Sequence, residues 1–177
     1  MKLLKIRRRV SKIVKIGEIH MIKKAEGKRK TQKAINILSW NKEKCFGCGA
    51  CEVTCSLYHH GECAPSQAGL RFHRGTWTGE PLVEVCRQCI EPECYYACPV
   101  EGALYIDETT GTRAINMDVC IGCGLCAKAC PFNKEGSIIR YVPNREKYFK
   151  CNLCNGDPRC TKICVVGALE YIKWKQI

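Results

Sequence analysis

Cysteine is the residue type in this sequence whose number and spacing could do chemistry. The 177 residues include 17 cysteines, an odd number. Sixteen of them fall in four runs of four, and the gaps within a run are two to five residues long. Such tight spacing suits chelation of one metal centre by one loop, whereas disulfides join scattered segments. In chain order the runs are Cys45, Cys48, Cys51 and Cys55 (run one); Cys86, Cys89, Cys94 and Cys98 (run two); Cys120, Cys123, Cys126 and Cys130 (run three); Cys151, Cys154, Cys160 and Cys164 (run four).

The spacing within the runs predicts iron–sulfur clusters. Run three follows the bacterial ferredoxin pattern C-x2-C-x2-C-x3-C-P, and run one lacks only the closing proline. In that pattern the first three thiolates bind one [4Fe–4S] cubane, and the fourth binds the neighbouring cubane. We expect the fourth cysteine of each run to begin a helix. Gly47, Gly49, Gly122 and Gly124 should let the backbone curl, so that N–H groups point at sulfur.

The number of cysteines in the runs equals the number of ligands that four cubanes need, because each cubane takes four thiolates and none of the sixteen is missing. All sixteen are therefore predicted metal ligands, and four [4Fe–4S] clusters are the predicted cofactors. No catalytic residue is expected, because a cluster that binds substrate needs an iron without a protein ligand. The alternative is zinc, which uses two Cys-x2-Cys pairs with a longer spacer and does not need this spacing. In that alternative the chain would be a basic zinc protein that binds nucleic acid through residues 1–33.

The remaining candidate side chains are one cysteine and three histidines. We expect Cys63 to be a buried free thiol packed near a cluster. Its alternatives are a ligand to a partner's metal centre and a redox-sensitive thiol. His59, His60 and His73 lie near runs one and two. With sixteen cysteines available, they should hydrogen-bond to sulfur or lie at the surface.

The elements that must position the cysteines are short. We expect each cysteine loop to be preceded by a strand and followed by one or two turns of helix. The expected strands are residues 34–40, 82–85, 104–107, 112–117, 137–142 and 169–174, with a hairpin turn at 108–111. Little other apolar sequence remains, so the clusters should fill the interior and folding should depend on metal. The predicted fold class is α+β, a duplicated bacterial-ferredoxin-like fold organised around four [4Fe–4S] clusters.

Charge divides the chain into two parts. Residues 1–44 contain 15 Lys or Arg and 3 Asp or Glu, whereas residues 45–177 contain 14 of each kind. Each cubane with its four thiolates adds about −2, so four clusters would bring the neutral part to roughly −8. We therefore predict a basic N-terminal extension over 1–33, with a helix over 3–16, and a four-cluster domain over 34–177. This distribution favours docking within a protein complex over nucleic acid.

No segment is long and apolar enough to span a bilayer, so no membrane span is expected. The first nine residues superficially resemble a twin-arginine export signal. However, Ser11, Lys12 and Lys15 interrupt the apolar stretch that follows, and no small-residue cleavage site comes after it. Reduced thiols and cluster assembly both suit a reducing compartment, so a cytoplasmic location is expected.

Residues 34–177 resemble the four-cluster ferredoxin-like subunits of molybdenum and tungsten oxidoreductases, carbon monoxide dehydrogenases and hydrogenases. The segments from Cys55 to Pro65 and from Cys151 to Cys160 look most like small subunits of tungsten-dependent aldehyde oxidoreductases. The resemblance implies a non-catalytic subunit that passes single electrons to or from a large tungsten- or molybdenum-pterin catalytic subunit, with a soluble ferredoxin as a further partner. Carbon monoxide dehydrogenase, formate dehydrogenase and hydrogenase are the alternative partners.

The resemblance also implies which cysteines share a cluster, whereas spacing indicates only that fourth cysteines cross over. Run one would pair with run four, and run two with run three. Val165 stands where the family often has proline. The implied groups are Cys45, Cys48, Cys51 and Cys164 (first quartet); Cys55, Cys151, Cys154 and Cys160 (second quartet); Cys86, Cys89, Cys94 and Cys130 (third quartet); Cys98, Cys120, Cys123 and Cys126 (fourth quartet).

Overall fold

The computed structural model describes residues 36–74 and 79–173. The predicted basic extension over 1–33 and its helix over 3–16 lie outside the described residues. All sixteen cysteines of the four runs lie within them.

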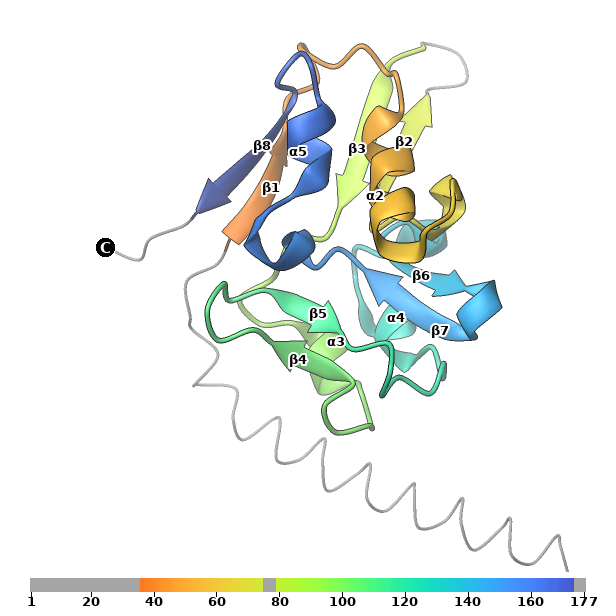
Figure 1. Cartoon of the computed structure of the whole chain (residues 1–177). Coiled ribbons are helices and arrows are strands. Elements are labelled where there is room, and N and C mark those ends of the chain that lie inside the picture. Colours follow the sequence, from red (N-terminus) through yellow and green to blue (C-terminus); the bar gives the residue numbers. More distant parts are fainter. Residues whose placement is uncertain (1–35, 75–78, 174–177) are drawn as a thin grey trace, which may run out of the picture.

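Four two-stranded antiparallel sheets form the framework. One sheet joins the two ends of the described chain, because Leu38 lies opposite Tyr171 in its register. The other three sheets are hairpins formed by consecutive strands (Figure 1). The pairs are β1 (Asn36–Trp40) with β8 (Leu169–Lys173), β2 (Leu70–Arg74) with β3 (Pro81–Val85), β4 (Leu104–Ile106) with β5 (Arg113–Ile115), and β6 (Ile139–Val142) with β7 (Lys147–Lys150).

The helices pack in two pairs that are nested along the chain. α2 contacts α5, and α3 contacts α4. Figure 1 shows α5 beside β1 and β8 and α2 beside β2 and β3 in one half of the molecule. In the other half, α3 lies beside β4 and β5, and α4 lies beside β6 and β7. The bounds are Ala50–His60 for α2, Glu93–Tyr96 for α3, Leu125–Ala129 for α4 and Arg159–Ile163 for α5, with 3₁₀ turns at Pro65–Gln67, Lys134–Gly136, Pro143–Arg145 and Leu153–Gly156.

The expected strands are confirmed, most of them with shorter bounds. Strands β4 and β5 have three residues each and are shorter than the expected strands 104–107 and 112–117. Likewise, β6 is shorter than the expected strand 137–142. Strands β2 and β7 were not predicted from the sequence. Both are short and carry Lys, Arg or His beside aromatic residues, so their apolar pattern is weak.

The expectation that the fourth cysteines begin helices is wrong. Cys55 lies in the middle of α2, and Cys130 and Cys164 are the C-caps of α4 and α5. The helices begin earlier, one residue before the third cysteine of each run. Left-handed Gly49 and Gly124 precede α2 and α4, and a proline precedes α3 and α5. These residues end the loop, so the third cysteine falls in the first helical turn and the fourth falls a turn later.

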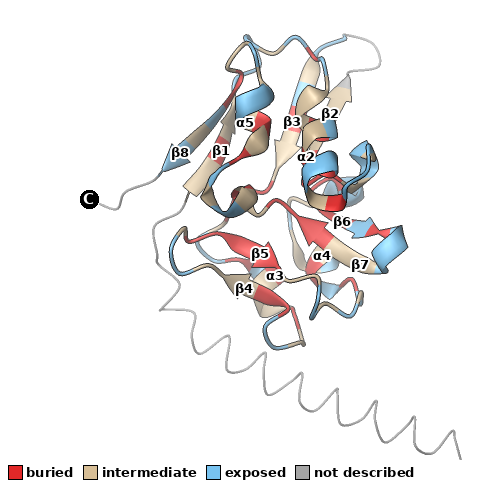
Figure 2. Ribbon diagram, viewed as in Figure 1, coloured by how far each residue is buried: buried red, intermediate tan, exposed pale blue. Residues whose placement is uncertain are grey.

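Charged side chains and thiols occupy much of the interior. Arg113 and Lys150 are 0% and 1% exposed, and they are the largest of the fully buried side chains. Figure 2 shows β5 buried along its whole length and β7 buried toward its end. Seven of the described cysteines are also buried: Cys55, Cys86, Cys94, Cys98, Cys126, Cys151 and Cys160. An interior of this composition needs a compensating group, because isolated buried charges are costly.

Candidate metal centres

The sixteen thiols line four separate cavities, four thiols to each cavity. The grouping of the thiols matches the four quartets that the resemblance implied, while metal ligation by them stays a prediction. The first quartet lines one cavity with Cys45, Cys48, Cys51 and Cys164, and the second lines another with Cys55, Cys151, Cys154 and Cys160. The third quartet lines a cavity with Cys86, Cys89, Cys94 and Cys130, and the fourth with Cys98, Cys120, Cys123 and Cys126.

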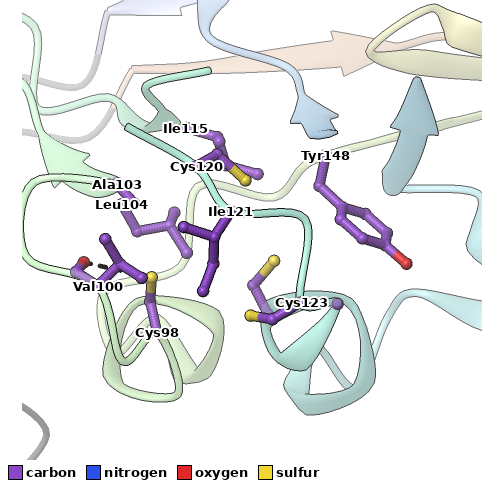
Figure 3. Close-up of a pocket in the computed structure, with 11 residues that line it drawn as sticks. Cys98, Val100, Ala103, Leu104, Ile115, Cys120, Ile121, Cys123 and Tyr148 are labelled. Atoms are coloured by element: carbon purple, nitrogen blue, oxygen red, sulfur yellow. Dashed lines mark hydrogen bonds between the residues drawn. The ribbon is translucent and has the colours of Figure 1, made fainter. Parts of the chain in front are cut away.

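The fourth cavity illustrates the surroundings of the thiols. Figure 3 shows Cys98, Cys120 and Cys123 arranged around one space, with Ile121 and Tyr148 beside it. Its other lining residues are mainly apolar. A space lined by four thiols and apolar groups fits a [4Fe–4S] cluster, which takes four cysteine ligands. The apolar groups would exclude water, and solvent exposure is one of the factors that set the reduction potential of a cluster.

Each helix, with the residues at its end, places cysteines in two neighbouring quartets. In α2, Cys51 belongs to the first quartet and Cys55 to the second. Residues i and i+4 lie on the same helix face, one turn apart, so two adjacent cavities receive thiols from one short helix. In the other three runs the fourth cysteine comes four residues after the third, at the C-cap of α4 and α5 and just beyond the C-cap of α3.

Positive φ angles shape the loops between the first cysteines of each run. Gly47, Gly49, Gly122 and Gly124 have φ of 70°, 73°, 71° and 75°, which confirms the expected curl. The Gly122 N–H donates to Cys120 Sγ over 3.5 Å. Runs two and four have no glycine at the equivalent positions. There Gln88 (φ 50°) and Leu153 (φ 54°) adopt the left-handed conformation instead, which is unusual for such residues and indicates a strong requirement for this loop shape.

Burial raises the pKa of at least one thiol in the first, second and fourth cavities well above its usual value. Burial raises the pKa of Cys51 and Cys55 to about 11, and that of Cys126 and Cys160 to about 12, and neighbouring thiols raise these values further. Metal binding must therefore displace a proton from each of these thiols.

Several polar groups contact sulfurs of the four quartets. The N–H groups of Gly69 and Ala168 donate to Cys55 Sγ and Cys164 Sγ, each over 3.2 Å. His59 Nε2 lies 3.5 Å from Cys154 Sγ, which confirms the expected sulfur contact for this histidine. Burial, together with His60, lowers the pKa of His59 to about 4, so its ring is neutral at physiological pH. Hydrogen bonds to sulfur of this kind tune the potential of an iron–sulfur cluster.

The other two histidines have different partners. His60 is buried and its Nε2 lies 3.0 Å from the Gln67 carbonyl oxygen, so the expectation of a sulfur contact or a surface position is wrong for this residue. His73 Nε2 lies 2.8 Å from Glu84 Oε2. Neither lines one of the four thiol cavities.

Cys63 is exposed, so the expectation of a buried thiol is wrong. It lies beyond Gly61, which ends α2, in a turn where the Ala64 N–H donates to Ser56 Oγ over 3.2 Å. The helix end carries the chain outward at this point. Cys63 lines none of the four thiol cavities.

Three polar residues beside the third quartet were not predicted from the sequence. Lys150 lines its cavity, and Lys150 Nζ lies 4.0 Å from Cys94 Sγ. The Gln88 side chain is fully buried: its Nε2 donates to the Cys151 carbonyl over 2.9 Å, and its Oε1 accepts from the Arg113 N–H over 2.7 Å. Gln88 thus ties run two to run four and to β5. A lysine directly before Cys151 is the one signal in the sequence, and it reads equally well as a surface residue.

The thiol cavities differ from sites for a single metal ion. Within residues 36–74 and 79–173, no three His, Cys, Asp or Glu side chains are grouped so as to hold one metal ion. A cubane makes no such demand, because each of its four irons takes one thiolate and the ligands surround a larger core.

In the same part of the chain, no helix combines the length and the apolar character that crossing a membrane requires.

Comparisons with known proteins agree with this chemistry. A family model described as a 4Fe-4S dicluster domain matches residues 78–173, more than half of the chain, and one described as a 4Fe-4S binding domain matches residues 42–58. The chain is 39% identical over 131 residues to the polyferredoxin-like subunit of an aliphatic sulfonate oxidoreductase from Pyrococcus furiosus, covering 74% of this chain and 72% of that one.

Two further relatives are matched over about half of their own length. One is a formate dehydrogenase iron-sulfur subunit from Haemophilus influenzae, 32% identical over 154 residues, with 72% of this chain and 48% of the relative covered. The other is an uncharacterised ferredoxin from Methanocaldococcus jannaschii, 43% identical over 95 residues, with 53% and 51% covered. With the four thiol cavities and the matches to family models, these similarities show that the chain belongs to the ferredoxin-like iron–sulfur electron-transfer subunits that carry the 4Fe-4S dicluster domain.

Proposed function

We propose that this chain passes single electrons through four [4Fe–4S] clusters to or from a large catalytic subunit. The observation that carries the proposal is the convergence of the sixteen thiols on four cavities, four to each. The first to fourth quartets would each hold one cluster. When bound, a [4Fe–4S] cluster supplies one-electron redox chemistry at a potential that its surroundings set. The chain itself makes and breaks no bond of a substrate in this proposal.

Electrostatic interactions between thiols of different quartets support a linear order for the clusters. Cys160 of the second quartet interacts electrostatically with Cys51 of the first, and Cys151 of the second interacts with Cys86 of the third. Cys126 of the fourth quartet interacts with Cys94 of the third. The order along the molecule is therefore first, second, third, fourth. Because electron tunnelling decays exponentially with distance, a row of neighbouring centres carries electrons where one long step would fail.

The two terminal quartets each have a ligand at the surface. Cys48 of the first quartet and Cys123 of the fourth are exposed. Exposed apolar side chains accompany them: Phe46 and Val165 line the first cavity, and Ile121 lines the fourth. Electrons would be exchanged with partners at these two ends. Apolar surface next to an exposed ligand favours close docking there.

The same arrangement supports a duplicated ferredoxin-like fold for residues 34–177. One unit comprises α2, α5 and the β1–β8 sheet, and the second unit, with α3, α4 and the β4–β5 sheet, is inserted within it. We propose that residues 1–33 form a separate basic segment that contributes to assembly.

For the catalytic partner we propose a tungsten- or molybdenum-pterin oxidoreductase, and a tungsten-dependent aldehyde oxidoreductase is the partner that the resemblance favours. The names of the relatives support two other candidates, an aliphatic sulfonate oxidoreductase and a formate dehydrogenase. A soluble ferredoxin would exchange electrons at the opposite end. A cytoplasmic location suits the unpaired thiols that cluster assembly requires.

Metal analysis and co-purification test the proposal. Four full clusters require about sixteen irons and sixteen acid-labile sulfides per chain after anaerobic purification, together with the brown colour of iron–sulfur proteins. About half that iron, with zinc making up the difference, would refute cluster binding by two quartets. Tungsten or molybdenum in a large co-purifying protein, and aldehyde-, sulfonate- or formate-dependent reduction of the clusters, would identify the partner.

A further inference from the structure

Two buried cations interact with thiols of the third quartet. Lys150 is the last residue of β7, is 1% exposed and lines this quartet's cavity. Its ammonium group lies 4.0 Å from Cys94 Sγ and also interacts electrostatically with Cys86. Arg113 on β5 is fully buried, and its guanidinium interacts with Cys86 and Cys89.

The Lys150 ammonium group lies inside the protein, and its electrostatic partners in the third quartet are Cys86 and Cys94. A positive charge at this place is opposite in sign to the thiolates that would hold a cluster. Its partners include Cys151 of the second quartet, so the charge lies where the two halves of the proposed wire meet.

The second quartet offers an informative contrast. Its nearby buried cation, Arg140, is 4% exposed and interacts with Cys55. However, Arg140 Nη2 lies 3.4 Å from Glu52 Oε1, so a carboxylate balances its charge. The salt bridges found among the described residues include Arg140 but not Lys150. Among the described residues, Lys150 therefore presents its charge to the third quartet without a paired carboxylate, whereas Glu52 offsets the charge that Arg140 presents to Cys55.

We propose that Lys150, supported by Arg113, raises the reduction potential of the cluster at the third quartet above the potentials of the other three. This inference rests on the proposed function, because it requires a cluster at each quartet. One electron from a reduced redox partner adds one negative charge at the third quartet, and no proton is taken up. Lys150 stabilises that added charge at short range, where low dielectric strengthens the attraction. Net charge and hydrogen bonds at sulfur are among the main determinants of cluster potential. Electrons would therefore rest at this internal position before moving on.

The test compares three variants of the full, cluster-loaded chain by redox titration followed by electron paramagnetic resonance. Lys150→Met should move one of four reduction steps to lower potential, lowering the reduced-to-oxidised ratio at a fixed potential at least tenfold, which equals 59 mV for one electron. Lys150→Arg keeps the charge and should retain the original step. Lys147→Met is the matched control: Lys147 is on the same strand, and its ammonium donates to the Asp118 carbonyl over 3.4 Å. It should leave all four steps unchanged.

The unsubstituted chain provides a second test that does not depend on the folding of Lys150→Met. One cluster must be reduced before the other three, and Cys89→Ala, which removes a ligand of the third quartet, must abolish that first step. Four coincident steps, or a first step that survives Cys89→Ala, would overturn the inference. So would a Lys150→Met chain with full iron content and unchanged potentials. A chain with fewer than four clusters would instead refute the proposed function.

Discussion

Cys63 and Cys123 are both exposed thiols, yet only Cys123 lines a cavity with three other thiols. Exposure therefore does not distinguish the two thiols, whereas the side chains around each of them do. If Cys123 holds a cluster as proposed, its exposure would bring that cluster to the surface, which a row of electron-transfer centres needs at its ends. Exposure of Cys63 leaves a side chain with little packing to lose.

Alanine at each of these positions should therefore have opposite effects on iron. Cys123→Ala should lose the iron of the fourth quartet or convert that cluster to a three-iron form, because one thiolate is missing. Cys63→Ala should keep about sixteen irons and change the free energy of unfolding by no more than about 0.5 kcal/mol, as is usual for surface substitutions. Anaerobic iron and sulfide analysis measures both. Iron loss in Cys63→Ala would make Cys63 a ligand.

Gln88 shows how one side chain can hold two runs together. It is buried, it has φ of 50°, and it hydrogen-bonds to the Cys151 carbonyl and the Arg113 N–H. Gln88→Ala leaves both backbone groups unsatisfied, at about 1–3 kcal/mol for each. Its denaturation midpoint under anaerobic conditions should fall accordingly. The control is Asn144→Ala, which removes an exposed hydrogen bond of 3.1 Å to Glu62 and should have almost no effect. Equal midpoints for the two variants would contradict the role given to Gln88.

At the scale of elements, short helices and loops place the thiols, and each loop is confined by another element. Run three lies against the turn before β7: a Cβ on Gly122 would come within 2.3 Å of the Glu146 carbonyl oxygen. Gly61, at the end of α2, has a similar φ of 73°, but a Cβ at this position would meet nothing within 4 Å. The two glycines therefore have nearly the same backbone φ, and they differ in the space available for a side chain.

This pair allows strain and collision to be measured separately. Gly61→Ala should cost roughly 1–2 kcal/mol, the usual penalty of a left-handed residue with a side chain. Gly122→Ala must in addition push the run three loop away from the Glu146 carbonyl, so iron at the fourth quartet should be lost. The measurements are iron content and the midpoint of unfolding in denaturant. Full iron content in Gly122→Ala would show that this loop can move without loss of its cluster.

At the scale of the whole molecule, charge is separated along the chain. The surplus of positive charge lies in residues 1–44, and clusters would make the remainder acidic. Inside the described part, buried Lys150 and Arg113 offset part of that negative charge. The basic segment would then be available to an external partner.

Removing residues 1–33 should leave the cluster content and the redox steps of the isolated subunit intact, because every cysteine lies beyond residue 44. Binding to the catalytic partner should weaken, and part of the lost affinity should depend on salt, since exposed charges are screened over about 10 Å at 0.1 M ionic strength. Size-exclusion chromatography of the truncated and full chains with the partner, at low and high salt, makes the comparison. If the complex is equally stable in all four conditions, the segment has no role in assembly.

The sequence by itself determined the chemistry. The number and spacing of the cysteines predicted four-thiol sites, and the glycines of runs one and three predicted the curled loops, because ligand spacing within a loop and φ preference are local properties. Most strands could be predicted for the same reason, since each flanks a loop with its own turn residues. The start of the helices was misplaced, because left-handed glycines and prolines decide where a loop ends.

Only the tertiary structure decided which distant runs share a cavity and which polar side chains surround it. Run one meets run four because β1 pairs with β8 and α2 packs on α5, and spacing within a run carries no information about such pairings. Likewise, a lysine before Cys151 and an arginine in a hairpin are ordinary surface residues in the sequence. They become buried cations beside the third quartet because β5 and β7 contact each other in the interior. Cys63 was misjudged for the converse reason, because the turn after α2 carries it outward, away from the cavities.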